Sequence, residues 1–212
     1  MKKIKLNSIS NIQIDKDPKQ MLPSINQHFL FNTLNSILSL CRENSEEARK
    51  VVLELSSYLR FNFDVTDGIV FLHEEIECIK SYLYIQKVRF GHRLKIVCDI
   101  QGDVNFLIPK NSLYGIIENA INHGILKKNH GGTIIFMVMR DSEKIIIKIS
   151  DDGVGMDDTQ IRGLFKDENR GSISTLNSQY KNLYNAKLEV VSKLNIGTYI
   201  TIYIPIENIK YE

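Results

Sequence analysis

The sequence predicts an α+β protein, in which an antiparallel helical hairpin precedes a mixed sheet covered by helices. Up to about Phe63, apolar residues recur every three or four positions, which is the period of an amphipathic helix. Beyond Arg93, short apolar segments alternate with polar residues and are separated by turn-forming residues, which is typical of strands. This change of period predicts two structural parts joined by one more helix.

The first two helices are expected to pair as a hairpin. The apolar residues of the first helix fall on one broad face: Ile25, Phe29, Leu30, Leu34, Ile37, Leu38 and Cys41. Pro23 marks the expected start of this helix, and Asn44 with Glu47 three residues later predicts a capping box at the start of the second. A lone hairpin cannot cover both of its apolar faces. We therefore expect a dimeric four-helix bundle, formed with a second copy of the chain.

The remaining elements follow from the same patterns. A third helix is expected from Leu72 to about Arg89, strands over 93–100, 132–139, 144–150, 187–192 and 198–205, and helices over 110–123 and about 172–185. In the last strand, Thr201 and Tyr203 alternate with isoleucines, which indicates a sheet with one face covered. The last two strands are expected to form a hairpin. The expected division is a polar lead-in (1–20), a dimerisation hairpin (21–66), a connecting helix (67–92) and a sheet domain (93–212).

The composition excludes several classes of protein. The 27 basic and 25 acidic residues nearly cancel to +2 and are scattered, so no nucleic-acid surface is predicted. Cys41, Cys78 and Cys98 lie far apart, which argues against a metal site or a disulfide framework and fits a reducing cytosolic compartment. No run of ~18 apolar residues is present to span a membrane, and polar residues interrupt the stretch where a signal peptide needs an apolar centre.

Three polar clusters lie in the sheet domain, each at the end of an expected element. They are ENAINHG (118–124), DDGVGMD (151–157) and IGTYITIYIP (196–205). Each has a role if the ligand is ATP. The Asp151 carboxylate can accept a hydrogen bond from the exocyclic amino group of adenine, which guanine does not offer at that position. Thr198 can reach the base edge through its hydroxyl.

The same clusters contain glycines suited to a turn beside the base and an amide suited to the Mg²⁺ ion of the phosphates. Gly153 and Gly155 allow a tight turn and a close approach of the backbone to the base. Asn119 supplies an amide oxygen suited to Mg²⁺, which keeps several waters and is shared with the phosphates. Each motif is weak alone, because a DxGxG turn, a helix closed by Gly124 and a GT dipeptide also occur without a nucleotide. Their order along the chain favours an ATP site.

Five stretches, in this order, resemble the LytS-type sensor histidine kinases: HFLFNTLN (28–35), YLYIQKVRFGHRL (82–94), IPKNSLYGIIENAINHGI (108–125), DDGVGM (151–156) and GTYITIYIP (197–205). That family joins a dimerising phosphoacceptor hairpin to an ATP-binding domain of the gyrase–chaperone–kinase–MutL (GHKL) superfamily. The resemblance extends from about residue 20 to residue 206. It implies a Bergerat-type α/β sandwich in the second half of the chain.

By position, the resemblance implies that His28 is the phosphoacceptor and that ATP with Mg²⁺ is the phosphoryl donor. A neutral imidazole is a competent nucleophile near pH 7, because its unperturbed pKa is ~6.5. Asn32 lies one helical turn further on and is a candidate for orienting a water during dephosphorylation. Glu118 is a candidate for polarising the attacking group or holding a metal-bound water. Asn122 and His123 belong to the implied nucleotide box.

A histidine on an apolar helix is more often a packed core residue, but Asn26, Gln27 and Asn32 are too polar for a deep core position beside His28. The apolar neighbours Phe29, Leu30, Phe31 and Leu34 are expected in the core of the bundle. His73, His92 and His130 are expected at the surface. Arg89 and Phe90 are expected to pack or to couple the two parts rather than to take part in catalysis.

The sequence departs from the family pattern at three places. Gln27 precedes His28 where proline is usual, and the absence of proline is expected to straighten the helix. Asn122 stands where related boxes often carry a lysine, which removes one positive charge. In the lid, Ser172 replaces a glycine, which restricts the approach of backbone to a triphosphate. As an N-cap, however, Ser172 can still present helix amides to phosphate. We expect ATP binding that is retained but weaker or dependent on ordering of the lid.

These features favour a protein-histidine kinase. ATP-dependent autophosphorylation of His28 in a homodimer would precede transfer to an aspartate of a response regulator, of which DNA-binding transcription factors are one class. The alternative is a degenerate kinase that serves as a dimeric response-regulator-binding module. A third reading, a GHKL ATPase or protein-serine kinase with the hairpin as scaffold, is disfavoured by the match around His28. The expected location is cytoplasmic, as part of a membrane-associated sensor, with membrane contact only through a sensor region that this sequence does not contain.

Overall fold

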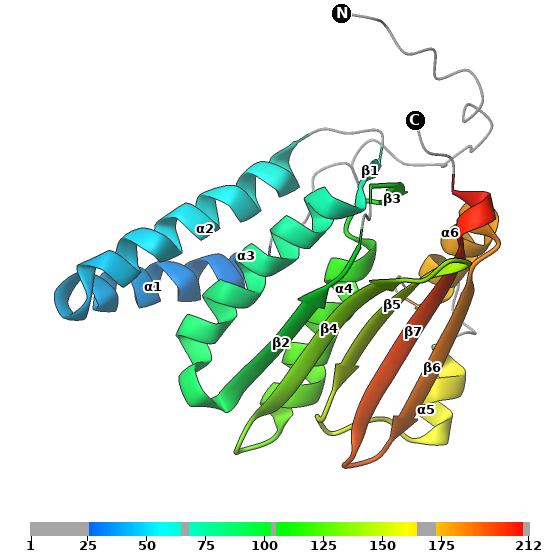
Figure 1. Cartoon of the computed structure of the whole chain (residues 1–212). Coiled ribbons are helices and arrows are strands. Elements are labelled where there is room, and N and C mark those ends of the chain that lie inside the picture. The colour runs from blue at the N-terminus through cyan, green and yellow to red at the C-terminus, as the bar shows by residue number, and fades with distance from the viewer. Residues whose placement is uncertain (1–25, 65–67, 103–104, 165–172, 210–212) are drawn as a thin grey trace, which may run out of the picture.

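The computed structural model describes residues 26–64, 68–102, 105–164 and 173–209. The helices in these ranges are α1 (Gln27–Glu43), α2 (Ser45–Phe63), α3 (Leu72–Phe90), α4 (Ser112–Asn119), α5 (Asp158–Gly163) and α6 (Ile173–Tyr184). The strands are β1 (Ile69–Phe71), β2 (Leu94–Ile100), β3 (Leu107–Pro109), β4 (Gly132–Arg140), β5 (Lys144–Asp151), β6 (Lys187–Lys193) and β7 (Gly197–Pro205). Figure 1 shows the helices α1 and α2 beside a layered part of helices and sheet. The predicted α+β class is confirmed.

The hairpin of α1 and α2 turns at the single residue Asn44. Its N–H donates to Leu40 O at 2.7 Å, and its side chain accepts from Glu47 N at 3.0 Å, so one residue ends α1 and begins α2. The reciprocal half of the expected capping box does not form. Instead, the Glu47 carboxylate accepts from the hydroxyl of Tyr84 in α3 at 2.6 Å, which ties the hairpin turn to the next helix.

The start of α1 corrects one expectation. Asn26 is the N-cap, since its side chain accepts from Phe29 N, and Gln27 is the first helical residue. Proline is well tolerated at that position, because the N–H it lacks has no partner within the helix. The absence of proline at Gln27 therefore has no bearing on whether the helix bends, and that expectation was wrong. The helix begins at Gln27 rather than near Pro23, which lies outside the described residues.

The main sheet is mixed and has the strand order β2-β4-β5-β7-β6. β2 pairs with β4 in parallel, and the other neighbours are antiparallel. All five predicted strands are confirmed to within one residue at each end. Ile200, Ile202 and Ile204 of β7 are buried as expected, because α4, α5 and α6 lie on that face of the sheet (Figure 1).

Among the strands and α-helices of the described ranges, three short ones were not predicted. β1 and β3 form a separate antiparallel pair, in which Val70 lies opposite Ile108. Each has only three residues, too few to show a period of two. α5 follows the cap residue Asp157, whose side chain exchanges hydrogen bonds with Gln160 in a capping box. That Asp-to-Gln spacing could have revealed the helix.

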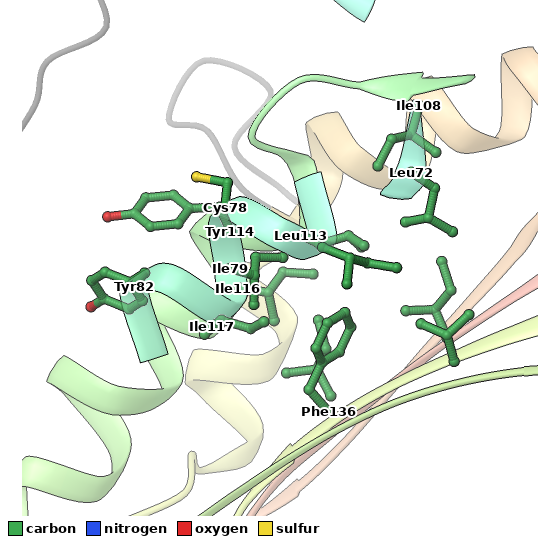
Figure 2. Packing of buried hydrophobic residues seen from close by; sticks show 14 of the residues in the cluster. Leu72, Cys78, Ile79, Tyr82, Ile108, Leu113, Tyr114, Ile116, Ile117 and Phe136 are labelled. Carbon is green, nitrogen blue, oxygen red and sulfur yellow. The ribbon is translucent and has the colours of Figure 1, made fainter. Parts of the chain in front are cut away.

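A continuous hydrophobic cluster extends from the hairpin through α3 and α4 to the sheet. Figure 2 shows Leu113 and Ile116 of α4 with Phe136 of β4 between the helices and the sheet. Tyr82 and Tyr114 lie at the end of the cluster that is further from the sheet (Figure 2). The packing thus joins the hairpin to the sheet domain through side chains rather than through the chain alone. None of the helices in the described ranges has the length and apolarity that crossing a membrane requires.

Candidate active site

A cavity of about 210 Å³ lies between α4, the carboxyl end of β5 and the start of β7. Its apolar walls are Ile116, Ala120, Ile149, Met156, Leu164, Ile173 and Ile200. Its polar side chains are Asn119, His123, Asp151 and Thr198. An apolar cavity with a few convergent polar groups is typical of sites for flat, partly polar ligands such as nucleobases.

Asp151 is the last residue of β5 and is buried at the cavity wall. Its Oδ1 accepts a hydrogen bond from Gly153 N at 2.8 Å. A side chain at Gly124 or at Gly153 would collide with the Asp151 carboxylate, so the two glycines make the room in which it sits. Burial raises the pKa of Asp151 to about 6, and the Gly153 N–H opposes that rise. An additional donor from a ligand would stabilise the charged form.

Thr198 lies opposite Asp151 in the register of β5 and β7. Its hydroxyl is 3.0 Å from Ser192 Oγ, which also accepts from Met156 N at 2.9 Å. Ser192 therefore connects the loop after β5 to the β6–β7 hairpin, beside two residues of the cavity wall. No motif in the sequence singled out Ser192. Pairing the two closing strands residue by residue would have placed it opposite Thr198.

The loop after β5 is held in place by its glycines. Gly155 has φ +65°, a conformation that side-chain-bearing residues rarely adopt, and a Cβ there would collide with the carbonyl of Lys193. Gly155 lines the cavity, whereas Gly153 is not among the lining residues and donates its N–H to Asp151 Oδ1. The predicted tight turn is thus present. Ser172, the substituted lid residue, lies outside the described residues.

The helix α4 ends at Asn119 and continues as a π-helical turn, Ala120–Gly124. Asn119, His123 and Gly124 line the cavity, whereas Asn122 is half-buried and is not among the lining residues. Across the described ranges there is no group of three or more His, Cys, Asp or Glu side chains arranged to hold a metal. A magnesium ion at the Asn119 amide would therefore share its remaining ligands with phosphate oxygens and water.

His28 is exposed in the first turn of α1 and does not line the cavity. The Asn32 amide Nδ2 lies 3.2 Å from His28 Nδ1 and 3.0 Å from Nε2, so the expected pairing of the two residues on one face is present. A neutral imidazole has one unprotonated nitrogen, and the amide can donate to it. A histidine nucleophile attacks with that lone pair, so this hydrogen bond would have to break if His28 has the predicted role.

The start of α1 contacts the end of α4. Asn26 Nδ2 donates to Glu118 Oε1 at 3.4 Å, and Glu118 directly precedes Asn119 at the cavity. Glu118 does not itself line the cavity. The structure thus brings the first turn of the helix that carries His28 to the residue beside the cavity.

An aromatic cluster holds α1 in this position. Phe29 is buried, with its ring centroid 5.1 Å from that of Tyr58 and 5.3 Å from that of Tyr82. Tyr114 of α4 completes the cluster, 5.0 Å from Tyr82 and with its hydroxyl 3.0 Å from that of Tyr58. Contacts of this kind contribute about 0.5–1.5 kcal/mol per pair beyond the burial of area.

Arg89 lies over the rings of Phe29 and Phe90, at 5.8 and 4.9 Å from their centroids, and donates to Gln86 Oε1 at 2.7 Å. Its position at the junction of α1 and α3 agrees with the expected packing role. The histidines expected at the surface, His73, His92 and His130, are exposed.

Two family models match the chain. The model described as histidine kinase matches residues 19–94, and the model described as histidine kinase-, DNA gyrase B-, and HSP90-like ATPase matches residues 109–208. The second match covers α4 to β7, and it confirms the Bergerat-type sandwich that the resemblance implied.

Three relatives are similar over most of this chain. The uncharacterized protein YwpD of Bacillus subtilis is 36% identical over 185 residues, which cover 85% of this chain and 66% of the relative. The sensor histidine kinase YpdA of Escherichia coli is 37% identical over 185 residues, which cover 85% of this chain and 33% of the relative. The sensor protein LytS of Staphylococcus haemolyticus is 30% identical over 210 residues, which cover 95% of this chain and 36% of the relative. The chain thus spans about a third of the length of YpdA and LytS.

Proposed function

The chain belongs to the LytS-type histidine kinases, and from this membership we propose that it is an ATP-dependent protein-histidine kinase that phosphorylates its own His28. One observation carries the proposal: the cavity with Asp151 and the helix with His28 meet at α4, through Asn26 and Glu118. An ATPase alone would not need an exposed histidine on the helix that makes this contact. A scaffold alone would not need the polar cavity.

The cavity suits adenine. Asp151 presents a carboxylate with one oxygen already bonded to Gly153 N, and an amino group of the base would donate to the carboxylate. Thr198, positioned by Ser192, would bond a second atom of the base edge. The apolar walls would contact the ring faces. Recognition of the base therefore rests on Asp151 and Thr198.

The phosphate end would lie toward Asn119, Asn122 and His123. A bound magnesium ion would neutralise phosphate charge, and the Asn119 amide oxygen is the protein ligand that we assign to it. Asn122 supplies an amide where a lysine would supply charge, so we expect weaker attraction of the triphosphate. The substitution at Ser172 acts in the same direction.

In the transfer step, an unprotonated ring nitrogen of His28 forms a bond to the γ-phosphorus. The bond from phosphorus to the bridging oxygen breaks, and ADP leaves with that electron pair. The imidazolium then loses its remaining N–H proton, for which Glu118 is the acceptor we assign. The phosphoryl group passes from His28 to an aspartate carboxylate of a response regulator, so His28 is free to react again.

The hairpin carries exposed apolar side chains that a second copy would cover. These are Phe31, Leu34 and Leu38 on α1 and Val52, Leu53 and Phe63 on α2. Phe31 is 66% exposed and Leu38 is 67% exposed, which is costly for a monomer in water. We therefore include a homodimer with a four-helix bundle in the proposal. The described cysteines are free thiols, which supports a cytoplasmic location.

The test uses γ-labelled ATP with Mg²⁺ and the full chain. The variants His28→Gln and Asp151→Asn are expected to lose the label, whereas His73→Gln, which changes an exposed histidine on α3, is expected to retain it. The label should be acid-labile and base-stable, and should move to a response-regulator receiver domain.

Other outcomes would redirect the assignment. Nucleotide binding without any labelling of the protein would favour the alternative, a degenerate kinase that serves as a response-regulator-binding module. An acid-stable label would indicate transfer to serine or threonine. A label that persists in His28→Gln would exclude His28 as the acceptor.

A further inference from the structure

The first turn of α4 is held by a carboxylate from another helix. The residue before α4, Asn111, makes no side-chain cap. Instead, Glu75 of α3 places its Oε1 2.7 Å from Leu113 N and 3.1 Å from Tyr114 N, and accepts a hydrogen bond from each. Those two N–H groups belong to the first helical turn, which has no partners inside the helix. Glu75 therefore replaces an N-cap, from 38 residues earlier in the chain.

Two further elements meet at the same turn. Ser112 Oγ lies 2.9 Å from the hydroxyl of Tyr180 in α6, the helix that follows the lid. Asn111 Nδ2 donates to Asn62 Oδ1 of α2 at 3.4 Å. The hairpin, the connecting helix and the lid helix thus all contact the start of α4.

The other end of α4 carries Asn119, the residue assigned above to the phosphate end of the nucleotide. α4 has eight residues and ends at Asn119. At 1.5 Å per residue, the turn held by Glu75 lies about 9 Å from Asn119 along the helix axis. A helix this short moves as a rigid body, so a shift at Leu113 displaces Asn119 by a similar amount.

α3 is in turn bound to the hairpin that carries His28. Besides the Tyr84–Glu47 bond, Ser81 Oγ donates to Glu54 Oε2 at 2.7 Å. A movement of the hairpin would therefore be passed to α3, and from Glu75 to α4.

We propose that Glu75 is a positioning residue for the phosphate end of the nucleotide site, which holds α4 against α3 so that Asn119 meets the triphosphate. This inference rests on the proposed kinase function. Glu75 itself does not contact ATP in this proposal. The site has two parts, a phosphate end at Asn119 and a base end at Asp151. Asn119 depends on Glu75, whereas Asp151, on β5, does not.

The state of the carboxyl decides which substitutions are informative. Glu75 is completely buried, and its Oε2 has no hydrogen-bond partner among the described residues. Burial raises the pKa of Glu75 to about 7, and the hydrogen bonds to the α4 backbone oppose that rise. A glutamine would keep the acceptor oxygen for Leu113 and Tyr114 and would add a donor in place of the unpaired oxygen. An alanine would remove the acceptor and leave two N–H groups without a partner.

The test compares two ligands on the full chain: a non-hydrolysable ATP analogue with Mg²⁺, and adenosine. In Glu75→Ala, we expect the dissociation constant of the ATP analogue to rise by about tenfold or more, because the two N–H groups at the start of α4 lose their acceptor and the helix is no longer held. The dissociation constant of adenosine, whose base edge meets Asp151 and Thr198 on the sheet, should rise by a smaller factor of about two to three, because Ile116 and Ala120 also line the cavity beside the base. Glu75→Gln should resemble the wild type. The matched control is Glu77→Gln, which changes an exposed glutamate on the same helix, paired with Lys80.

A merely structural role would weaken both ligands by the same factor, and that result would overturn the inference, as would an unchanged affinity for both. If Glu75→Ala does not fold, Glu75→Asp decides instead. Aspartate keeps the charge but is one methylene too short to reach both N–H groups, so it should weaken the ATP analogue selectively. A wild-type protein that binds neither ligand would overturn the proposed kinase function, which a loss confined to the Glu75 variants would not.

Discussion

The side-chain amide of Asn26 lies 3.4 Å from the carboxylate of Glu118. Asn26 begins the helix that carries His28, and Glu118 precedes Asn119 at the cavity of the same chain. The burial of Phe29 among Tyr58 and Tyr82 supports this arrangement. The helix that carries His28 and the helix that lines the cavity are therefore joined within one chain by a direct side-chain contact.

From this contact we expect autophosphorylation within one protomer. Heterodimers that combine one His28→Gln chain with one Asp151→Asn chain, purified through two different tags, should carry almost no label. In such a heterodimer the intact histidine and the intact cavity are on different chains. Wild-type homodimers with the same tags are the control. Label near half of the wild-type level would show transfer between protomers instead.

Asp151→Asn should stabilise the unliganded protein while it abolishes nucleotide binding. The pKa of Asp151 is about 6 in the folded chain and ~3.9 when unfolded, so the folded state binds the proton more tightly. The cost of the buried charge is absent below pH ~4, develops as the pH rises to ~6, and is complete at pH 7. We expect Asp151→Asn to raise the free energy of unfolding by about 1–2 kcal/mol at pH 7.

Urea unfolding of the wild type and of Asp151→Asn, at pH 4 and at pH 7, tests whether the substitution stabilises the protein only where Asp151 is charged. The gain from Asp151→Asn should disappear near pH 4, where the wild-type carboxyl is protonated in the folded state. The control is Asp99→Asn, which changes an aspartate that accepts only from the nearby Gln101 among the described residues. Equal gains at pH 4 and pH 7 would contradict the assignment to the charge.

Replacing Phe29 should affect folding, whereas replacing Phe31 should affect formation of the dimer. Phe29 is 3% exposed, so Phe29→Ala should lower the free energy of unfolding by about 3–5 kcal/mol. Phe31 is 66% exposed in the single chain, so Phe31→Ala should leave the stability of the monomer nearly unchanged and weaken the dimer. Analytical ultracentrifugation and urea unfolding measure the two quantities. A dimer unaffected by Phe31→Ala would place the dimer interface elsewhere.

Ser192→Ala should weaken ATP binding without unfolding the protein. The change removes the hydroxyl that accepts from Met156 N and lies beside Thr198 Oγ1. If this costs about 1 kcal/mol of binding free energy, as the loss of one hydrogen bond does, the dissociation constant rises about fivefold. Calorimetric titration with a non-hydrolysable ATP analogue measures it, with Ser57→Ala on the exposed face of α2 as the control. An unchanged affinity would show that Thr198 does not depend on Ser192.

Much of the fold could be predicted from the sequence, because in a long segment the spacing of apolar residues indicates whether it forms a helix or a strand. The five strands of the main sheet, the two hairpin helices and α3 each have a clear period of two or of 3.6. β1 and β3 were missed because three residues show no period, and each strand exists only through its pairing with the other. The expected effect of Gln27 was wrong because the helix boundary decides whether a proline would bend it.

The candidate site divides in the same way. Asp151, Gly155, Asn119, His123 and Thr198 were named from motifs, and all five line the cavity. Ser192 and Glu75 were not named, because their roles depend on partners far away in the sequence. Ser192 acts through the register of β6 and β7, and Glu75 acts through the packing of α3 on α4.

By itself, the sequence determined the long helices and strands, five of the residues that line the cavity and the place of Asn32 on the same helical face as His28, because these depend on short-range periodicity and on motifs of neighbouring residues. Only the tertiary structure decided that α1 lies against α4 through Asn26 and Glu118. It also decided that the buried carboxylate of Glu75 holds the start of α4. Contacts of this kind depend on how helices pack in space, and the spacing of residues along one helix does not specify which surface of another helix it will meet.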